Sequence, residues 1–215
     1  MPLKIITAVL FLLIMGLLFT QRFSLPKELS VRITAGAGED AGYGFGEKLR
    51  RGSLIETQNG FLKITIEEKL HDVDQAQTNI WLSKNTTIEL ECLYQNELVI
   101  RLIKGRILTQ TQAETPLVIK TNHTKQFLYK GTASFVNYDF LETIHVIPLK
   151  DSSVQTKIPE TNESFTESVP YSIHETIPVS HKFLEINLLA GDSANFYQWT
   201  NTLHFLDMSP TIFYN

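Results

Sequence analysis

The chain is poor in cysteine, with one in 215 residues. A disulfide within the chain is therefore excluded, and a fold of this length has to depend on a buried apolar core. In the run TTIELECLYQ, Cys92 alternates with Ile88, Leu90 and Tyr94. This spacing predicts that its thiol points into the core as a small hydrophobic group.

Clusters of basic residues are also lacking. The densest group is Lys48, Arg50 and Arg51, and the formal net charge of the chain is −4. Proteins that bind nucleic acids carry a basic stripe or patch that neutralises phosphates. We therefore expect no nucleic acid among the partners.

Catalytic and metal-binding motifs are absent as well. The six histidines are scattered, and neither H-E-x-x-H nor G-x-S-x-G occurs. The group His71, Asp72 and Asp74 lacks the glycine and the bidentate glutamate of a calcium loop. The glycines that follow Ala35 miss the G-x-G-x-x-G spacing by one position. We therefore expect no enzyme activity, no catalytic residue, no cofactor, no metal and no small-molecule substrate.

One long hydrophobic run is present, from Ile5 to Phe19, and no charge interrupts it. A helix of this length spans roughly 23 to 26 Å, slightly less than the hydrocarbon core of a bilayer, so a cleaved signal peptide stays open. The sequence GLLFTQRFSLP offers no small residues for cleavage, which favours a retained anchor. Residues 1–22 are thus a membrane anchor or signal, and a single-pass protein with its bulk outside the cytoplasm, in the periplasm or on the outer face, is expected.

Apolar residues recur with a period of two between residues 48 and 150, for example at Leu62, Ile64 and Ile66. Turn signals such as Gln58-Asn59-Gly60 separate these runs. Short strands about every ten residues predict an all-β domain, either a short β-solenoid or a β-sandwich, preceded by the membrane helix.

The flanks of this domain have a different composition. Residues 23–47 hold closely spaced glycines and predict a tether, although ELSVRIT is compatible with a first short strand. Residues 151–180 are rich in Ser, Thr, Glu and Pro and predict a polar linker. Residues 181–215 predict a strand followed by a segment, 193–207, for which helix and strand both remain open, packing on the β domain.

Three phrases in order, RRGSLIETQNGFLKITI, NIWLSKNTTIEL and LVIRLIKGRILTQTQAETPLVIKT, resemble the FecR domain family, the extracytoplasmic part of transmembrane signal regulators. The resemblance covers residues 49–148 and implies an all-β extracytoplasmic module. It departs from the family's regulators because four residues, rather than a sigma-binding domain, precede the membrane segment. The matching motif residues have structural roles at strand ends and turns: Gly52, Thr57, Thr87, Gly105, Thr121, Gly131 and Thr132.

A candidate partner surface comes from the same alternation. Trp81 lies between Ile80 and Leu82 and should point outward, as should Val99 and Ile103 on a neighbouring strand. Such a strip either binds a partner or is covered by the C-terminal segment with Trp199 and Phe205. The sequence favours a membrane-anchored FecR-like binding module for an envelope protein, with signalling as one possible use. A single-span carrier or assembly factor for lipid or polysaccharide is the alternative.

Overall fold

The computed structural model describes residues 27–37, 43–68 and 76–183 of the chain. Regular structure in these ranges is β, apart from one 3-10 turn, so the all-β prediction is confirmed. The predicted membrane segment Ile5–Phe19 and residues 184–215 of the predicted C-terminal unit lie outside these ranges. Within them, no helix has the length and apolar character needed to cross a bilayer.

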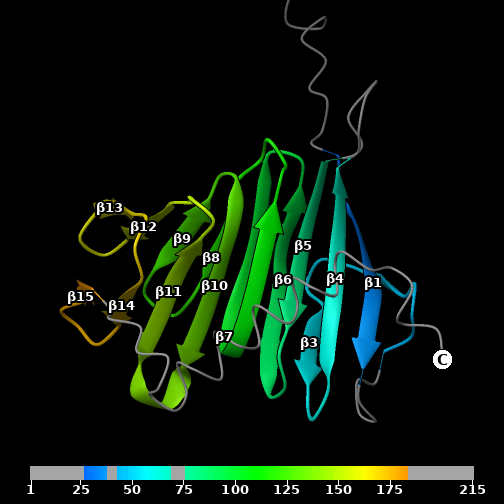
Figure 1. Ribbon diagram of the computed structural model, residues 1–215, viewed down its shortest axis with the longest axis horizontal. Coiled ribbons are helices and arrows are strands. Elements are labelled where there is room, and N and C mark those ends of the chain that lie inside the picture. The colour runs from blue at the N-terminus through cyan, green and yellow to red at the C-terminus, as the bar shows by residue number, and fades with distance from the viewer. Residues whose placement is uncertain (1–26, 38–42, 69–75, 184–215) are drawn as a thin grey trace, which may run out of the picture.

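Figure 1 shows the described strands in chain order. Their bounds are β1 (Ser30–Ala37), β2 (Lys48–Leu49), β3 (Leu54–Thr57), β4 (Phe61–Glu68), β5 (Ala76–Leu82), β6 (Thr86–Tyr94), β7 (Glu97–Thr111), β8 (Leu117–Lys120), β9 (Lys125–Leu128), β10 (Gly131–Tyr138), the 3-10 turn η1 (Asp139–Leu141), β11 (Thr143–Leu149), β12 (Val154–Ile158), β13 (Glu163–Glu167), β14 (Tyr171–His174) and β15 (Ser180–Phe183).

All of these strands belong to one continuous hydrogen-bonded sheet, which is bent into two facing layers. Layer A contains β3, β6, the first half of β7, β8, β9, β12 and β13. Layer B contains β1, β2, β4, β5, the second half of β7, β10, β11, β14 and β15. The named strand pairs are antiparallel except β7 with β8. This arrangement is nearer to a sandwich than to a solenoid.

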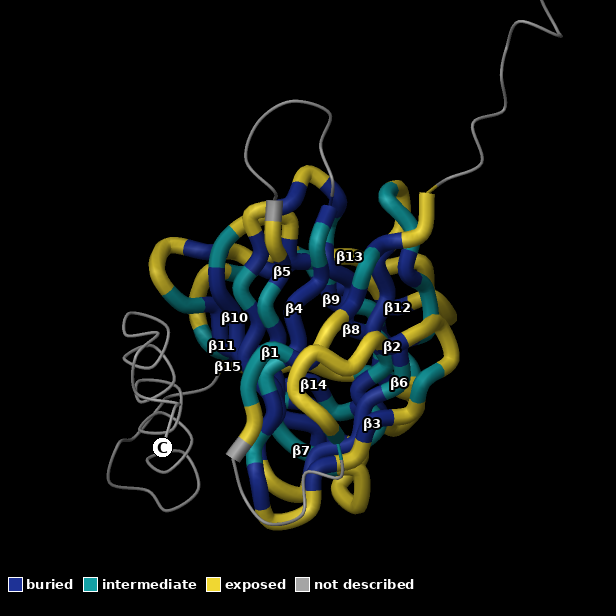
Figure 2. The backbone as a smooth tube through the Cα atoms, turned by 90° about the vertical axis from the view of Figure 1, so that its right-hand side faces the viewer, coloured by how far each residue is buried: buried dark blue, intermediate teal, exposed yellow. Residues whose placement is uncertain are grey.

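Alternating side chains from both layers fill the space between them, and Figure 2 follows these buried positions along the backbone. Burial of a large aliphatic or aromatic side chain stabilises a fold by about 1.5–3 kcal/mol. The inward side chains that form this single core include Leu62, Ile64 and Ile66 of β4, Leu98, Ile100 and Leu102 of β7, Phe135 of β10 and Tyr171 of β14.

Strand β7 connects the two layers by crossing from one to the other at Gly105. Its first half pairs with β6 and β8 in layer A, and from Gly105 onward it pairs with β10 in layer B. Gly105 has φ +95°, a backbone conformation that residues with a Cβ rarely adopt. A Cβ there would lie 2.5 Å from Thr86 Oγ1 and 2.7 Å from Asn85 O. The glycine is therefore required by both backbone conformation and close packing.

The predicted polar linker at residues 151–180 is wrong, because this segment forms β12, β13, β14 and the first residue of β15. Val154 and Ile158 point into the body, and Tyr171 and Ile173 belong to buried positions of β14. The polar composition was misleading because some of these polar groups are buried with partners. Thr156 Oγ1 and the Tyr171 hydroxyl lie 2.8 Å apart within the core.

The predicted tether at residues 23–47 is wrong in its middle part, whereas the first short strand with which ELSVRIT was compatible is confirmed. Residues 30–37 form β1, which pairs with β4 from Ser30↔Glu67 to Ala37↔Phe61. Leu29, Val31 and Ile33 are buried. The alternation of these apolar residues favours a strand, and the glycines that favour a tether begin only toward the end of that strand.

The inward position predicted for Cys92 is not observed. The register between β6 and β7 shifts between Leu90 and Cys92, so that Leu93 takes the next core position and Cys92 pairs with outward-facing Val99. The thiol is half-buried, and this burial, followed by the nearby Glu97 carboxylate, raises its pKa. A β-bulge of this kind reverses the inside-outside pattern of the residues beyond it.

Candidate functional site

The three residues predicted to form one partner surface lie on opposite sides of the molecule. Trp81 of β5 faces outward from layer B, where it pairs with Leu108. Val99 and Ile103 lie on the first half of β7, in layer A. The two groups separate because β7 changes layers at Gly105, so only its second half lies beside Trp81. The predicted single strip is therefore not formed.

Val99 instead belongs to an apolar row on the outer face of layer A. The register places Val99 opposite Val118, and Val118 opposite Phe127. Val99 and Val118 are buried even though they face outward. Long neighbouring side chains can cover such positions with their methylene stems while the charged ends stay in water.

A basic row crosses the same face beside the apolar row. Arg101 of β7 lies opposite Lys120 of β8, Lys120 lies opposite Lys125 of β9, and Lys125 lies opposite Lys157 of β12. Each step joins two like charges on neighbouring strands. Such directly opposed like charges destabilise a sheet. The basic row thus lowers the stability of the fold through electrostatic repulsion, so folding does not explain its presence.

Acidic residues offset half of the basic row. Arg101 Nη1 lies 3.9 Å from Glu89 Oε2, and Lys120 forms an ion pair with Glu91. Within the described ranges no carboxylate pairs with Lys125 or Lys157. The Lys157 ammonium instead lies 4.7 Å from the centre of the Phe127 ring, a cation–π contact. Positive charge therefore remains at the β9 and β12 end of the row.

The motif residues from the FecR resemblance lie at turns or near strand ends, except Gly105, which lies within β7 where this strand changes layers. Gly52 and Gly131 have φ values of +81° and +107°, as expected for turn glycines. Thr57 Oγ1 accepts a hydrogen bond from Thr86 N at 3.0 Å and donates to Ser83 O, whereas the Thr87 hydroxyl is buried without a partner among the described residues. Thr132 N donates to Ser152 Oγ at 2.8 Å.

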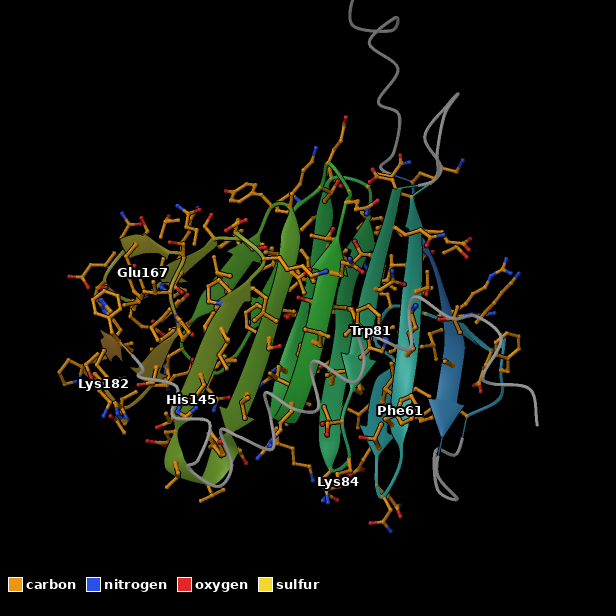
Figure 3. All side chains as sticks on the ribbon, viewed as in Figure 1. Phe61, Trp81, Lys84, His145, Glu167 and Lys182 are labelled. Atoms are coloured by element: carbon orange, nitrogen blue, oxygen red, sulfur yellow. The ribbon has the colours of Figure 1, made fainter. Side chains whose placement is uncertain are left out.

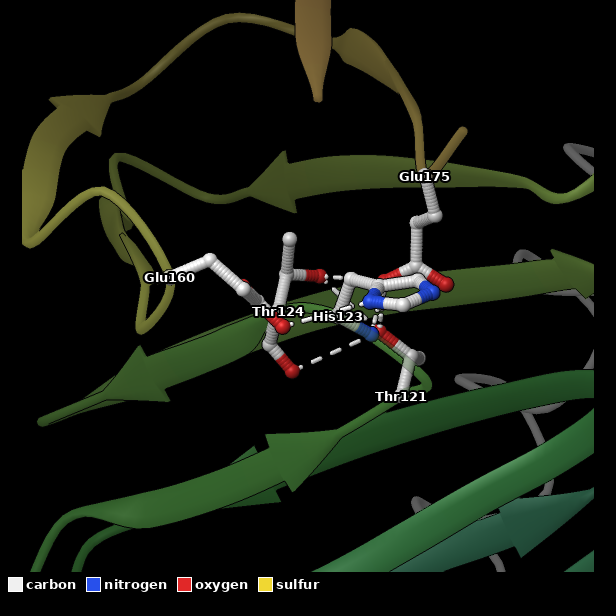
Figure 4. Close-up of polar contacts among 5 residues, drawn as sticks. All are labelled: Thr121, His123, Thr124, Glu160 and Glu175. Atoms are coloured by element: carbon white, nitrogen blue, oxygen red, sulfur yellow. Dashed lines mark hydrogen bonds and ion pairs between the residues drawn. The ribbon is translucent and has the colours of Figure 1, made fainter. Parts of the chain in front are cut away.

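Thr121 belongs to a buried polar cluster that ties the two layers together at one end (Figure 4). Thr121 and Thr124 bracket the turn between β8 and β9 in layer A, and both hydroxyls donate to Glu175 Oε1, at 2.6 Å from Thr124. Glu175 follows β14 of layer B, and its backbone N–H donates to Glu142 O at 2.7 Å. Glu175 is 1% exposed, so its carboxylate is out of reach of a substrate and its role is structural.

His123, in the same turn, reaches outward to a second hairpin. Its Nδ1 lies 3.2 Å from Glu160 Oε1 in the turn between β12 and β13. The backbone N–H of Glu160, and then His123, lower the pKa of the Glu160 carboxyl. The pair is partly exposed and joins two hairpins.

No group of three or more potential metal ligands occurs in the part of the chain that the structure describes. The acidic group His71, Asp72 and Asp74 lies outside that part.

Glu68, at the end of β4, is a carboxylate in an unfavourable position. It is 7% exposed, and its Oε2 has no hydrogen-bond partner in the described ranges. Burial, and then repulsion from Glu114, raise the pKa of the Glu68 carboxyl above its usual 4.5. The folded state therefore holds this proton more tightly than the unfolded chain does.

Stability should consequently fall as pH rises from the ordinary value of 4.5 through the raised pKa of Glu68. Glu68→Gln removes this ionisation, so we expect the variant to be more stable than the wild type at neutral pH and the gain to shrink toward acidic pH. Urea unfolding midpoints across this range measure the effect. Glu67→Gln, which alters the outward face of the same strand, is the control. A gain that is independent of pH would contradict the assignment to Glu68 ionisation.

No protein-family model matches the sequence, and the search of curated proteins found no match. Two crystal structures of candidate anti-sigma factors from Parabacteroides distasonis have a similar arrangement. The first is 12% identical with a TM-score of 0.43, over 62% of this chain and 60% of that one. The second is 12% identical with a TM-score of 0.45, over 72% of this chain and 73% of that one.

Sequence reasoning missed the basic row entirely. Its members are isolated in the sequence, and they become neighbours only through the register of β7, β8, β9 and β12. The one available signal was the pair Lys120 and Lys125, which flank the TNHT turn and are opposed if that turn closes a hairpin.

Proposed function

We propose that this protein is a binding module that acts without catalysis and recognises an acidic surface of an envelope protein through the outer face of layer A. In this proposal Ile5–Phe19 anchors the chain in the cell membrane and the β domain lies outside the cytoplasm. The resemblance to the FecR family supports both points. Binding would then serve signalling or envelope organisation.

The observation that carries the proposal is the ladder of like charges from Arg101 to Lys157. Glu89 and Glu91 offset the charges of Arg101 and Lys120, so Lys125 and Lys157 form the step between two unpaired charges. This step lowers the stability of layer A by a few tenths of a kcal/mol up to about 1 kcal/mol. An acidic partner would convert that repulsion into attraction. The adjacent, partly exposed Phe127 would supply apolar contact at the centre of the same interface.

The interior of the fold favours this reading over a lipid carrier. A carrier needs a groove between its layers to shield acyl chains. Here Phe135 and Tyr171, from two different strands of layer B, are fully buried in the core between the layers. Because these side chains fill the interior, we propose that the protein binds its partner at an outer face.

Photo-crosslinking in living cells tests the proposal with the full chain. A photoreactive residue at position 125 should capture an envelope protein, and one at the exposed Lys84 should not. Lys125→Glu with Lys157→Glu should abolish the crosslinked complex, because both unpaired positive charges are reversed. Lys48→Glu with Lys84→Glu makes the same change in net charge elsewhere and should leave the complex intact.

Binding of the purified partner should also weaken with added salt, since the proposed contact is electrostatic. Equal capture from positions 84 and 125 would contradict the assigned face. Recovery of lipid or glycan in place of protein at position 125 would overturn the proposal in favour of the carrier.

A further inference from the structure

The outer face of layer B has an unusual burial pattern. The register aligns Lys63, Trp81, Leu108, Ser134 and Ile147 across β4, β5, β7, β10 and β11. Their strand neighbours Ile64, Ile80, Ile107, Phe135 and Val146 point into the core, so this row points away from it. Figure 3 labels Trp81 in the middle of this layer, with Phe61 and His145 on other strands.

Apolar side chains on this face are nevertheless buried. Trp81 is 4% exposed, Leu108 is 1% exposed and Val136 is 2% exposed. Phe61 and Leu149 pack beside Trp81. The Lys63 ammonium lies 4.8 Å from the centre of the Trp81 ring. Side chains stand perpendicular to a sheet, so neighbours on the same face shield the two sides of a ring rather than its outer edge.

Two buried serine hydroxyls also indicate that another segment covers the outer face of layer B. Ser134 is 0% exposed and Ser172 is 1% exposed, and neither Oγ has a hydrogen-bond partner among the described residues. Serine on an open sheet face would be solvated. Every described strand belongs to layer A or layer B, so none of them lies across this face.

We propose that the outer face of layer B is the docking site for the chain's own C-terminal segment, residues 184–215. The chain enters this segment directly from β15, the edge strand of the same layer. Attachment at the edge gives the segment a high effective concentration at the face, which a separate partner lacks.

The reach of the segment is sufficient. Trp81 on β5 is separated from β15 by β7, β10, β11 and β14. Strands lie about 4.8 Å apart, so the distance across the face is roughly 24 Å. About eight extended residues cover this distance at ~3.3 Å each, so the segment can cross the layer and continue over it.

The chemistry of the segment matches the face. It contains Glu185, Asp192 and Asp207 but no lysine or arginine. The face carries Lys63 opposite Trp81, Arg106 opposite Val136 and Lys182 opposite Ser172. The segment is also rich in large apolar side chains suited to covering Trp81 and Val136, among them Phe196, Trp199, Leu203, Phe205 and Leu206.

Thiol labelling tests the docking in the full chain, held in phosphatidylcholine nanodiscs. Cys92→Ser removes the native thiol, and Ser134→Cys then places a thiol of similar size on the covered face. Ser164→Cys, on exposed β13, is the matched control. In the full chain we expect maleimide to react at position 134 about tenfold or more slowly than in a chain that ends at Phe183. The rate at position 164 should be the same in both chains.

A second variant avoids truncation. Trp199→Asp with Phe205→Asp keeps the chain length and should raise the rate at position 134 while leaving the rate at position 164 unchanged. Circular dichroism must show the same β content in each chain. Equal rates at position 134 in the full and shortened chains would overturn the proposal. Protection that grows with protein concentration would also overturn it, because a second copy would then be the cover.

This docking is independent of the proposed function. The charge reversals at Lys125 and Lys157 alter layer A and should not change labelling at position 134. Loss of the C-terminal segment should not change capture from position 125. The two proposals can therefore fail separately.

Discussion

Gly105→Ala should destabilise the fold by about 3–5 kcal/mol, one of the two largest losses expected from a single substitution here. Two costs combine at this position. The backbone has φ +95°, which alanine adopts only with strain. The added Cβ would also lie 2.5 Å from Thr86 Oγ1 and 2.6 Å from Thr86 Cα. Because the second contact involves backbone, rotation of the threonine side chain cannot relieve it.

Gly52→Ala separates the two costs. Gly52 has φ +81°, but nothing lies within 4 Å of its ideal Cβ. At Gly52 only backbone strain opposes the substitution, so we expect the free energy of unfolding to fall by about 1–2 kcal/mol. Denaturant unfolding of both variants measures the difference. Equal losses at the two glycines would mean that the corner at Gly105 moves to accommodate a side chain, and that the layers are less rigidly joined than the contacts indicate.

The general architecture was predictable from local patterns in the sequence. Residues 62–67 alternate apolar and polar side chains, and β4 has the corresponding inward and outward faces. Gly52 and Gly105 have the positive φ values expected of glycines at a turn or bulge, although Gly105 lies within β7 and not at the start of a strand. These features depend on neighbouring residues only, which is why sequence reasoning could reach them.

The errors came from features that depend on distant partners. Cys92 faces outward because a bulge opposite β7 changes the register, and the sequence of β6 alone contains no sign of it. The β strands after Asp151 were missed because buried threonine and serine have the composition of a linker. The Thr156 hydroxyl can be buried because it forms a hydrogen bond with the Tyr171 hydroxyl, which lies on a different strand.

The candidate binding face illustrates the same limit. Val99 was correctly predicted to face outward, but its pairing with Trp81 assumed that β7 stays in one layer. Once the strand crosses at Gly105, Val99 joins Val118 and the basic row. A functional surface that spans several strands is a property of register, and register was not available from one sequence.

A polar side chain completes the corner at which β7 changes layers, and removing it should have the second of the two large effects. The register of β6 and β7 passes from Leu102↔Ile88 to Lys104↔Thr87, which leaves Ile103 without a partner residue in β6. Asn137 of β10 fills this gap. Its Nδ2 donates to Leu102 O at 2.8 Å and to Ile103 O at 2.9 Å.

Asn137→Leu should therefore cost about 2–4 kcal/mol, because it keeps the volume nearly constant but removes both hydrogen bonds to the Leu102 and Ile103 carbonyls at a 4% exposed position. Asn137→Asp, whose ionised side chain accepts but cannot donate, should lose at least as much at neutral pH. Asn96→Leu, in the exposed turn between β6 and β7, should change stability by no more than about 0.5 kcal/mol. Denaturant unfolding midpoints of the three variants, compared with that of the wild type, measure these changes in stability. If Asn137→Leu were as mild as the Asn96 control, water would have to reach both carbonyls, and the corner would be held by Gly105 and its contacts with Thr86 alone.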